Sequence, residues 1–105
     1  MDKLNNIMKA LGTAIVSDAK RNLKTRKKDK NSSGKLGNSL SSKVNNDELI
    51  IYAEDYAEFV DQGTKDSKGN DFLTDAVNKN FNAFGDKVAE AYAEDLLDKL
   101  DKTIQ

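Results

Sequence analysis

The 105-residue chain carries 17 Lys+Arg and 18 Asp+Glu, a formal net charge of −1, and it contains no His and no Cys. The lack of these two residue types excludes disulfides, thiolate metal sites and imidazole acid–base catalysis. At this length the sequence predicts a single domain over residues 1–105 with one modest hydrophobic core. No apolar stretch approaches the ~20 residues that a membrane span requires, so we expect no membrane partner.

The two parts of the chain differ in charge: residues 1–45 carry a net charge of +8 and residues 46–105 a net charge of −9. This asymmetry is typical of an oriented contact with nucleic acid or with another copy of the chain. The basic run from Lys20 to Lys35 could contact nucleic-acid phosphates. It has no interleaved aromatic residues for stacking on single strands, so a solvated or partner-facing segment is at least as good an interpretation. The basic candidates for a contact with DNA or a neighbouring subunit are Lys20, Arg21, Lys24, Arg26, Lys27, Lys28, Lys30 and Lys35.

Apolar residues recur every three or four positions from Leu4 to Leu23, so the sequence predicts an amphipathic helix over residues 2–28. Residues 25–35 contain no apolar side chain, which predicts a solvated loop. Residues 36–44 and the strongly apolar residues 49–53 read as two strands joined by an Asn-Asn-Asp turn. We therefore expect an antiparallel hairpin after the first helix.

The segment from Tyr56 to Thr64 is predicted to anchor this sheet to the helices. Tyr56, Phe59 and Val60 have helical spacing and fall on one face of a short turn. Gly63 is placed where the turn must end, because glycine adopts a positive φ without steric cost.

A long final helix is predicted over residues 72–102, with Asp71 as its N-cap. Its apolar residues step by three or four, and we interpret them as core. Together the elements predict an α+β fold, in which a small antiparallel sheet is flanked by an N-terminal helix and a long C-terminal helix. The apolar stripe comprises Leu73, Val77, Phe81, Phe84, Val88, Tyr92, Leu96 and Leu100.

Four acidic residues, Glu54, Asp55, Glu58 and Asp61, cluster in the sequence. Paired carboxylates can share a proton or a metal ion, but a solvated acidic face is the interpretation we favour. The chain offers no set of acid, base and nucleophile. We therefore predict that it is not an enzyme and needs no cofactor.

Three blocks of sequence, in order, resemble the tail-completion proteins of long-tailed bacteriophages, also called neck or head–tail joining proteins. The blocks are residues 33–40 (SGKLGNSL), residues 56–64 (YAEFVDQGT) and residues 71–76 (DFLTDA). The family pattern has Thr, Glu and Pro where this chain has Ser33, Asp61 and Asp71. The segment between Thr64 and Phe72 is short, so a strand or hairpin often found there is expected to be reduced.

The resemblance implies a non-catalytic virion protein, assembled in the host cytoplasm, that forms a ring, commonly a hexamer, in the neck. Its partners would be head-connector or portal-side proteins and tail-tube or terminator proteins. The basic segment would lie against a neighbour's acidic surface or face DNA in the channel. A small DNA-binding accessory protein that uses residues 20–35 is the alternative. The resemblance gives an architectural role to Tyr56, Phe59, Val60, Gly63, Thr64, Phe72 and Leu73.

Overall fold

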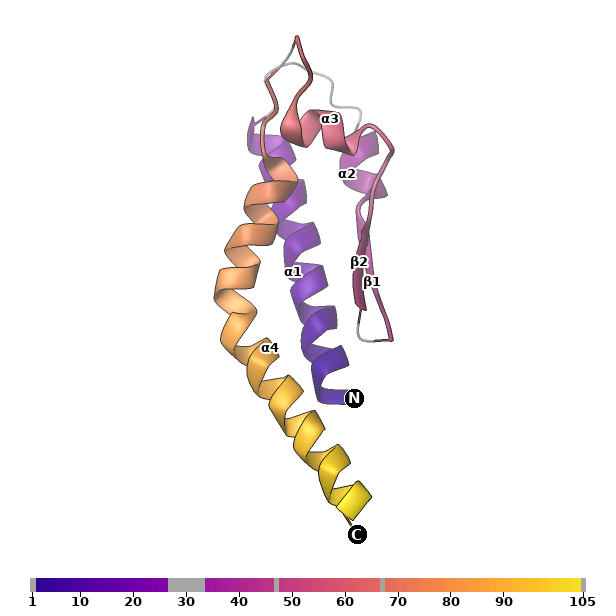
Figure 1. Cartoon of the computed structure of the whole chain (residues 1–105). Helices are drawn as coiled ribbons and strands as arrows, with labels where there is room; N and C mark the ends of the chain where they lie inside the picture. Colours follow the sequence, from indigo (N-terminus) through magenta and orange to yellow (C-terminus); the bar gives the residue numbers. More distant parts are fainter. Residues whose placement is uncertain (1, 27–33, 47, 67, 105) are drawn as a thin grey trace.

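A computed structural model of the chain describes residues 2–26, 34–46, 48–66 and 68–104. Two long helices run side by side, with a β-hairpin and two short helices beside them (Figure 1). The predicted α+β class, a small antiparallel sheet with an N-terminal and a long C-terminal helix, is confirmed, and the long helix beside the sheet is the N-terminal one (Figure 1). The elements are α1 (Asp2–Arg26), α2 (Lys35–Ser39), β1 (Ser41–Asn45), β2 (Glu48–Tyr52), α3 (Ala57–Gln62) and α4 (Phe72–Ile104).

The helices α1 and α4 form an antiparallel pair. At one end of the pair, Asn22 of α1 donates a hydrogen bond to the carbonyl of Phe72, the first residue of α4. At the other end, the backbone N–H of Leu4 donates to the carboxylate of Asp95 at 2.8 Å. The start of each helix therefore lies beside the later part of the other, as Figure 1 shows.

The core lies where the end of α1 meets the start of α4. The three-and-four spacing of α1 places Leu11, Ile15 and Ala19 on the face that it buries. Phe72, at 0% exposure the most buried large residue, enters this cluster from α4. The helix predicted over residues 2–28 is thus confirmed as far as Arg26.

The hairpin packs on α1 through one face. Ser42 pairs with Ile51 and Val44 with Leu49 in the antiparallel register, so these four residues point to the same side of the sheet. Leu49 and Ile51 pack against the core. A Cβ atom on Gly12 of α1 would lie 2.8 Å from Leu49 Cδ1 and 2.9 Å from Ser42 Cβ. Glycine at this position is what lets the helix approach the hairpin so closely.

The first predicted strand, residues 36–44, is wrong in its first half. Residues 35–39 form the short helix α2, and β1 begins only at Ser41. The spacing of Leu36 and Leu40 fits one turn of helix as well as one face of a strand, so the pattern did not separate the two. Gly34, with φ 81°, reverses the chain into α2, and the Ser39 hydroxyl donates to the Leu36 carbonyl.

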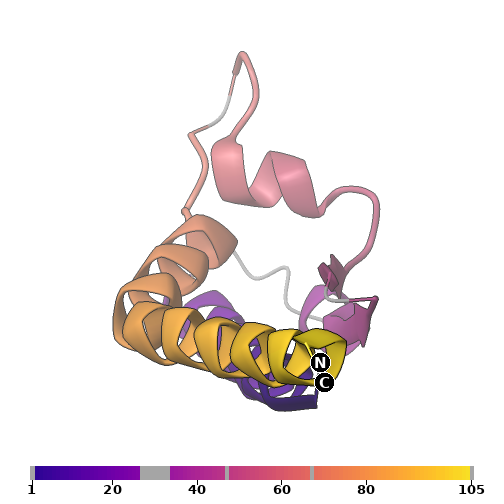
Figure 2. The same ribbon diagram turned by 60° about the horizontal axis from the view of Figure 1, so that its bottom comes forward.

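The stripe predicted as core on the last helix is also partly wrong. Leu73, Val77, Phe84 and Val88 pack against the core. The outer members are exposed: Phe81 by 54%, Tyr92 by 50%, Leu96 by 38% and Leu100 by 46%. Phe81 and Tyr92 lie alongside α1 but on the side of α4 that is turned away from it. Only the part of α4 after Asp95, which bonds to the start of α1, extends past α1 (Figures 1 and 2).

Candidate functional site

The anchor segment forms α3 and the turn that leaves it, but one of its two aromatic residues, Phe59, does not act as predicted. Tyr56 precedes α3 and is half-buried, and Val60 packs against the core. Phe59 is 57% exposed, so its predicted role in fixing the sheet to the helices is wrong. The buried face of α3 is instead formed by Ala57 and Asp61, which are four residues apart.

Gly63 ends α3 in a conformation that suits glycine alone. Its φ is 92° and its ψ is −179°, a region that residues with a Cβ atom rarely enter. Its N–H donates to the Phe59 carbonyl at 2.8 Å. The loop then folds back on α3, because the N–H of Asn70 donates to the Val60 carbonyl at 2.9 Å. The approach is so close that a Cβ atom on Gly69 would lie only 2.2 Å from the Asp61 carbonyl oxygen.

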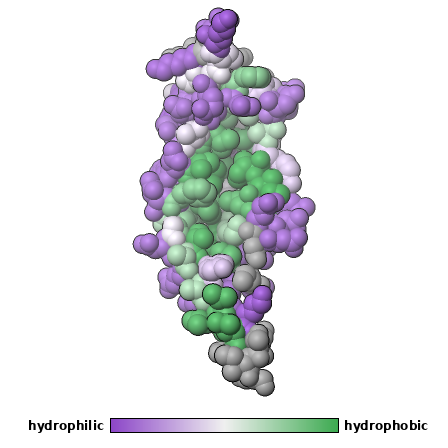
Figure 3. Space-filling model, in the orientation of Figure 1, coloured by the Kyte–Doolittle hydropathy of each residue, from purple (hydrophilic) through white to green (hydrophobic). Residues whose placement is uncertain are grey.

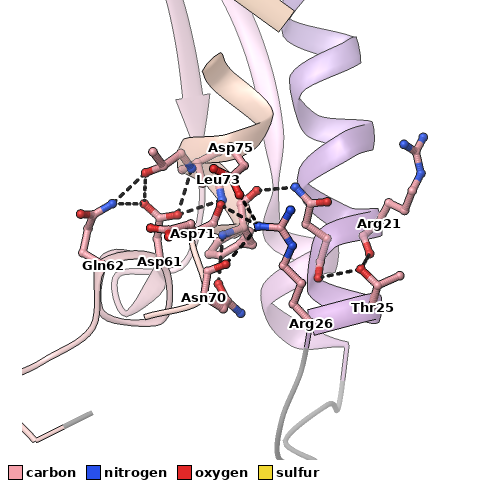
Figure 4. Close-up of polar contacts among 12 residues, drawn as sticks. Arg21, Thr25, Arg26, Asp61, Gln62, Asn70, Asp71, Leu73 and Asp75 are labelled. Carbon is pink, nitrogen blue, oxygen red and sulfur yellow. Dashed lines mark hydrogen bonds and ion pairs between the residues drawn. The ribbon is translucent and has the colours of Figure 1, made fainter. Parts of the chain in front are cut away.

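The side chain of Asp61 links α3 to the start of α4 (Figure 4). One carboxylate oxygen accepts the backbone N–H groups of Leu73 and Thr74, both at 2.9 Å. The other oxygen accepts the Thr74 hydroxyl and the Gln62 side-chain amide, both at 2.6 Å. Free N–H groups and the positive end of the dipole are found at a helix N-terminus. Asp61 therefore caps α4, although it lies eleven residues before Phe72, the first residue of that helix.

This role explains the ionisation of Asp61. Burial raises the pKa of the carboxyl group, but the hydrogen bonds from Thr74, Gln62 and Leu73 outweigh it and hold the pKa below its ordinary value. The carboxylate is 6% exposed. The prediction of a solvated acidic face over Glu54, Asp55, Glu58 and Asp61 is therefore wrong for Asp61, whereas Asp55 and Glu58 are exposed.

Asp71 does not cap α4 as predicted. Its φ is 56°, in the left-handed region, whereas an N-cap residue has an extended backbone. The residue before it, Asn70, contributes instead, because its side-chain oxygen accepts the N–H of Phe72 at 3.0 Å. The local sequence signal for a cap was right about where the helix begins and wrong about which carboxylate serves it.

The N-terminus of α1 is capped in the same long-range manner. Asp95 lies on the distal part of α4, by which we mean residues 89–104. Its buried carboxylate accepts the N–H of Leu4 at 2.8 Å and that of Lys3 at 3.4 Å. No sequence signal marked Asp95 as a cap, since its partners lie more than ninety residues away. Both long helices thus begin at a carboxylate that another element supplies.

The basic segment is partly used inside the subunit. Arg26 donates to the carbonyls of Asn70 and Asp71 and forms an ion pair with Asp75, so it ties the end of α1 to the start of α4 (Figure 4). Arg21 pairs with Asp18 at 2.9 Å. Of the remaining candidates, Lys24 and Lys35 are exposed and Lys20 is half-buried, while Lys27, Lys28 and Lys30 lie outside the described residues.

The opposite charges of the two parts of the chain meet within the fold. Lys3 of α1 pairs with Glu94 of α4 at 3.2 Å. In a second pair the signs are reversed, because Lys79 of α4 approaches Asp18 of α1 at 3.8 Å. The buried amide of Asn80 donates to Asp18, and this hydrogen bond is the main reason why the pKa of Asp18 lies below its ordinary value. Part of the opposite charge of the two parts of the chain is therefore paired inside the subunit.

The chemistry of these groups is that of helix capping and packing. Within the described residues, no group of three or more acidic side chains is placed to hold a metal ion. None of the helices in the same residues is long and apolar enough to cross a membrane. Comparison of the chain with protein-family models, with curated proteins and with solved structures finds no match.

Proposed function

We propose that the chain is a structural subunit of the neck of a long-tailed bacteriophage, a tail-completion protein that assembles as a ring between head and tail. The observation that carries the proposal is that each of the three resembling blocks contributes at least one buried residue to a single cluster. These residues are Leu40 of the first block, Ala57 of the second, and Phe72 and Ala76 of the third, with exposures of 3%, 6%, 0% and 1%.

The polar contacts give the same support. Asp61 of the second block caps the helix that the third block opens, through Leu73 and Thr74. In the first block, Ser39 accepts the N–H of Glu54, two residues before the second block begins. The blocks occur together because they form one folding unit, and an architectural role for them needs no catalytic residue.

Electron microscopy of the purified protein tests the proposal. Ring particles of fixed copy number are the expected result, either from the protein alone or after addition of phage heads that lack tails. Restoration of tail attachment to such heads is the functional readout. Particles that never form, together with heads that stay unjoined, would contradict the proposal.

A DNA-binding accessory protein is the second candidate, and the exposed Lys24 and Arg21 at the end of α1 favour it. Binding that depends on phosphate contacts weakens linearly with the logarithm of salt concentration. Fluorescence anisotropy with duplex DNA should then show salt-dependent binding that a Lys20→Gln/Lys24→Gln variant weakens. Binding that neither salt nor this variant alters would count against it.

A further inference from the structure

One face of α4 is apolar and uncovered over much of its length. Tyr92 and Leu96 are 50% and 38% exposed, and the small residues Gly85 and Ala89, also exposed, continue the face toward Phe81. By the 3.6-residue period these positions, with Leu100, fall on one side of the helix. We call this set (Phe81, Gly85, Ala89, Tyr92, Leu96 and Leu100) the α4 face.

Most charged residues of the same stretch lie elsewhere on the helix, although Lys99 falls on the α4 face by the same period. Glu90 and Glu94 fall on the opposite side by the same period and Asp86 falls between the two sides; all three are exposed. A helix that faces water all round would spread its charges around the axis. The largely apolar side of α4 is typical of a helix that packs against a partner.

The α4 face continues into an apolar groove. The groove has a volume of about 430 Å³ and lies between α4, α1 and the hairpin. Figure 3 shows the apolar side chains as a band that runs down the molecule between α4 and the hairpin and on to the distal part of α4. The groove is lined by Met8, Leu11, Leu49, Phe81, Phe84, Gly85 and Val88.

The distal part of α4 cannot fill this groove in its own chain. The groove is bordered by Phe84 and Val88 of α4 itself, and the helix continues away from it without interruption to Ile104 (Figure 1). One copy therefore has an empty apolar groove and an uncovered apolar helix end on the same side. Two copies that meet through this side place the helix end of each over the groove of the other.

The area available agrees with a contact between two copies. Phe81 and Tyr92 are about half exposed and offer about 100 Å² each. With the leucines, the small residues and the groove lining we estimate about 500 Å² per copy, at the upper end for a single patch on a monomer. Two such patches together reach the ~1,000 Å² at which specific interfaces begin. A single patch left uncovered would be an aggregation hazard.

We infer that the α4 face and the groove are the contact surface for a second copy of this chain, with the distal α4 of one copy lying in the groove of the other. The inference rests on the proposed function for its place in a ring. A reciprocal contact closes a pair, whereas the same contact made in one direction only leads from copy to copy and can close a ring. In both arrangements the contact is apolar and should persist at high salt.

Two alanines of α4 allow a matched test. Ala89 lies on the α4 face, and Ala83 lies on the charged side near Asp86 and Lys87; both are exposed. Ala89→Glu would bury an unpaired charge in the contact, so the dissociation constant measured by sedimentation should rise at least about tenfold. Ala83→Glu has the same effect on helix propensity and should leave the dissociation constant within about twofold. Circular dichroism melts confirm that both variants fold.

Because the chain has no cysteine, a single introduced cysteine can only join two copies. One preparation carries Ala93→Cys, on the margin of the α4 face, and a second preparation carries Met8→Cys, in the groove. When the two are mixed and oxidised, they should cross-link, whereas a mixture of Ala83→Cys and Met8→Cys should not. Rings or other oligomers that are indifferent to Ala89→Glu would overturn this inference and leave the proposed function standing. A wild-type chain that is monomeric at every concentration and never cross-links would overturn the inference, while the tail-attachment assay decides the proposed function separately.

Discussion

Replacing Asp61 with Asn tests the long-range cap of α4. The amide keeps one oxygen for the N–H groups of Leu73 and Thr74, but its NH₂ group cannot accept the hydrogen bonds that Gln62 and Thr74 donate to the second oxygen. The change removes a charge at a helix N-terminus, ~0.3–2 kcal/mol, and at least one hydrogen bond to a charged group, ~1.5–3 kcal/mol. We expect a loss of about 2–3 kcal/mol in the free energy of unfolding.

Urea unfolding followed by circular dichroism measures this loss, and a thermal melt should show a fall of roughly 10 °C in Tm. The matched control is Asp55→Asn, since Asp55 is exposed and should change stability by no more than about 0.5 kcal/mol. A chain in which both variants unfold alike would show that the cap contributes nothing beyond surface charge.

The same variant makes a prediction about pH. The pKa of Asp61 is below its ordinary value, so the carboxylate's contribution is fully present above the unfolded pKa of ~3.9 and is lost as pH falls through the folded pKa. The difference between wild type and Asp61→Asn should therefore be complete at pH ~7 and shrink below pH ~4. A difference that stays constant into acid would refute the assignment of the effect to the ionised group.

Three further sets of variants test the packing. Gly63→Val should cost about 2–4 kcal/mol, because its φ of 92° is strained for a β-branched residue; an unchanged Tm would make Gly63 an ordinary loop residue. Gly12→Ala should destabilise by about 1 kcal/mol despite better helix propensity, because its Cβ would lie 2.8 Å from Leu49, whereas Gly85→Ala, with nothing within 4 Å, should stabilise by up to ~1 kcal/mol. Changes in Tm of the same sign for Gly12→Ala and Gly85→Ala would contradict this prediction. Phe59→Ser should change stability by less than about 0.5 kcal/mol, against about 3–5 kcal/mol for Phe72→Ala, and a large loss at Phe59 would place it in the core.

The sequence by itself determined the elements whose signals are local. The spacing of Leu11 and Ile15 predicted the buried face of α1, and the turn residues around Asn46 predicted the hairpin, because a helix face and a tight turn are decided within a few residues. Gly63 was identified as the end of α3 for the same reason: its positive φ is a property of one residue.

What only the tertiary structure decided is which groups find a partner. Periodicity gave α4 one apolar stripe, but whether Phe81 or Tyr92 is buried depends on which side of α4 the helix α1 and the hairpin cover. Capping followed the same rule. Asp71 stands next to the helix and does not cap it, while Asp61 and Asp95 reach helix ends that are distant in sequence. A carboxylate satisfies whichever free N–H groups the fold brings within hydrogen-bond distance, and chain order places no limit on that choice.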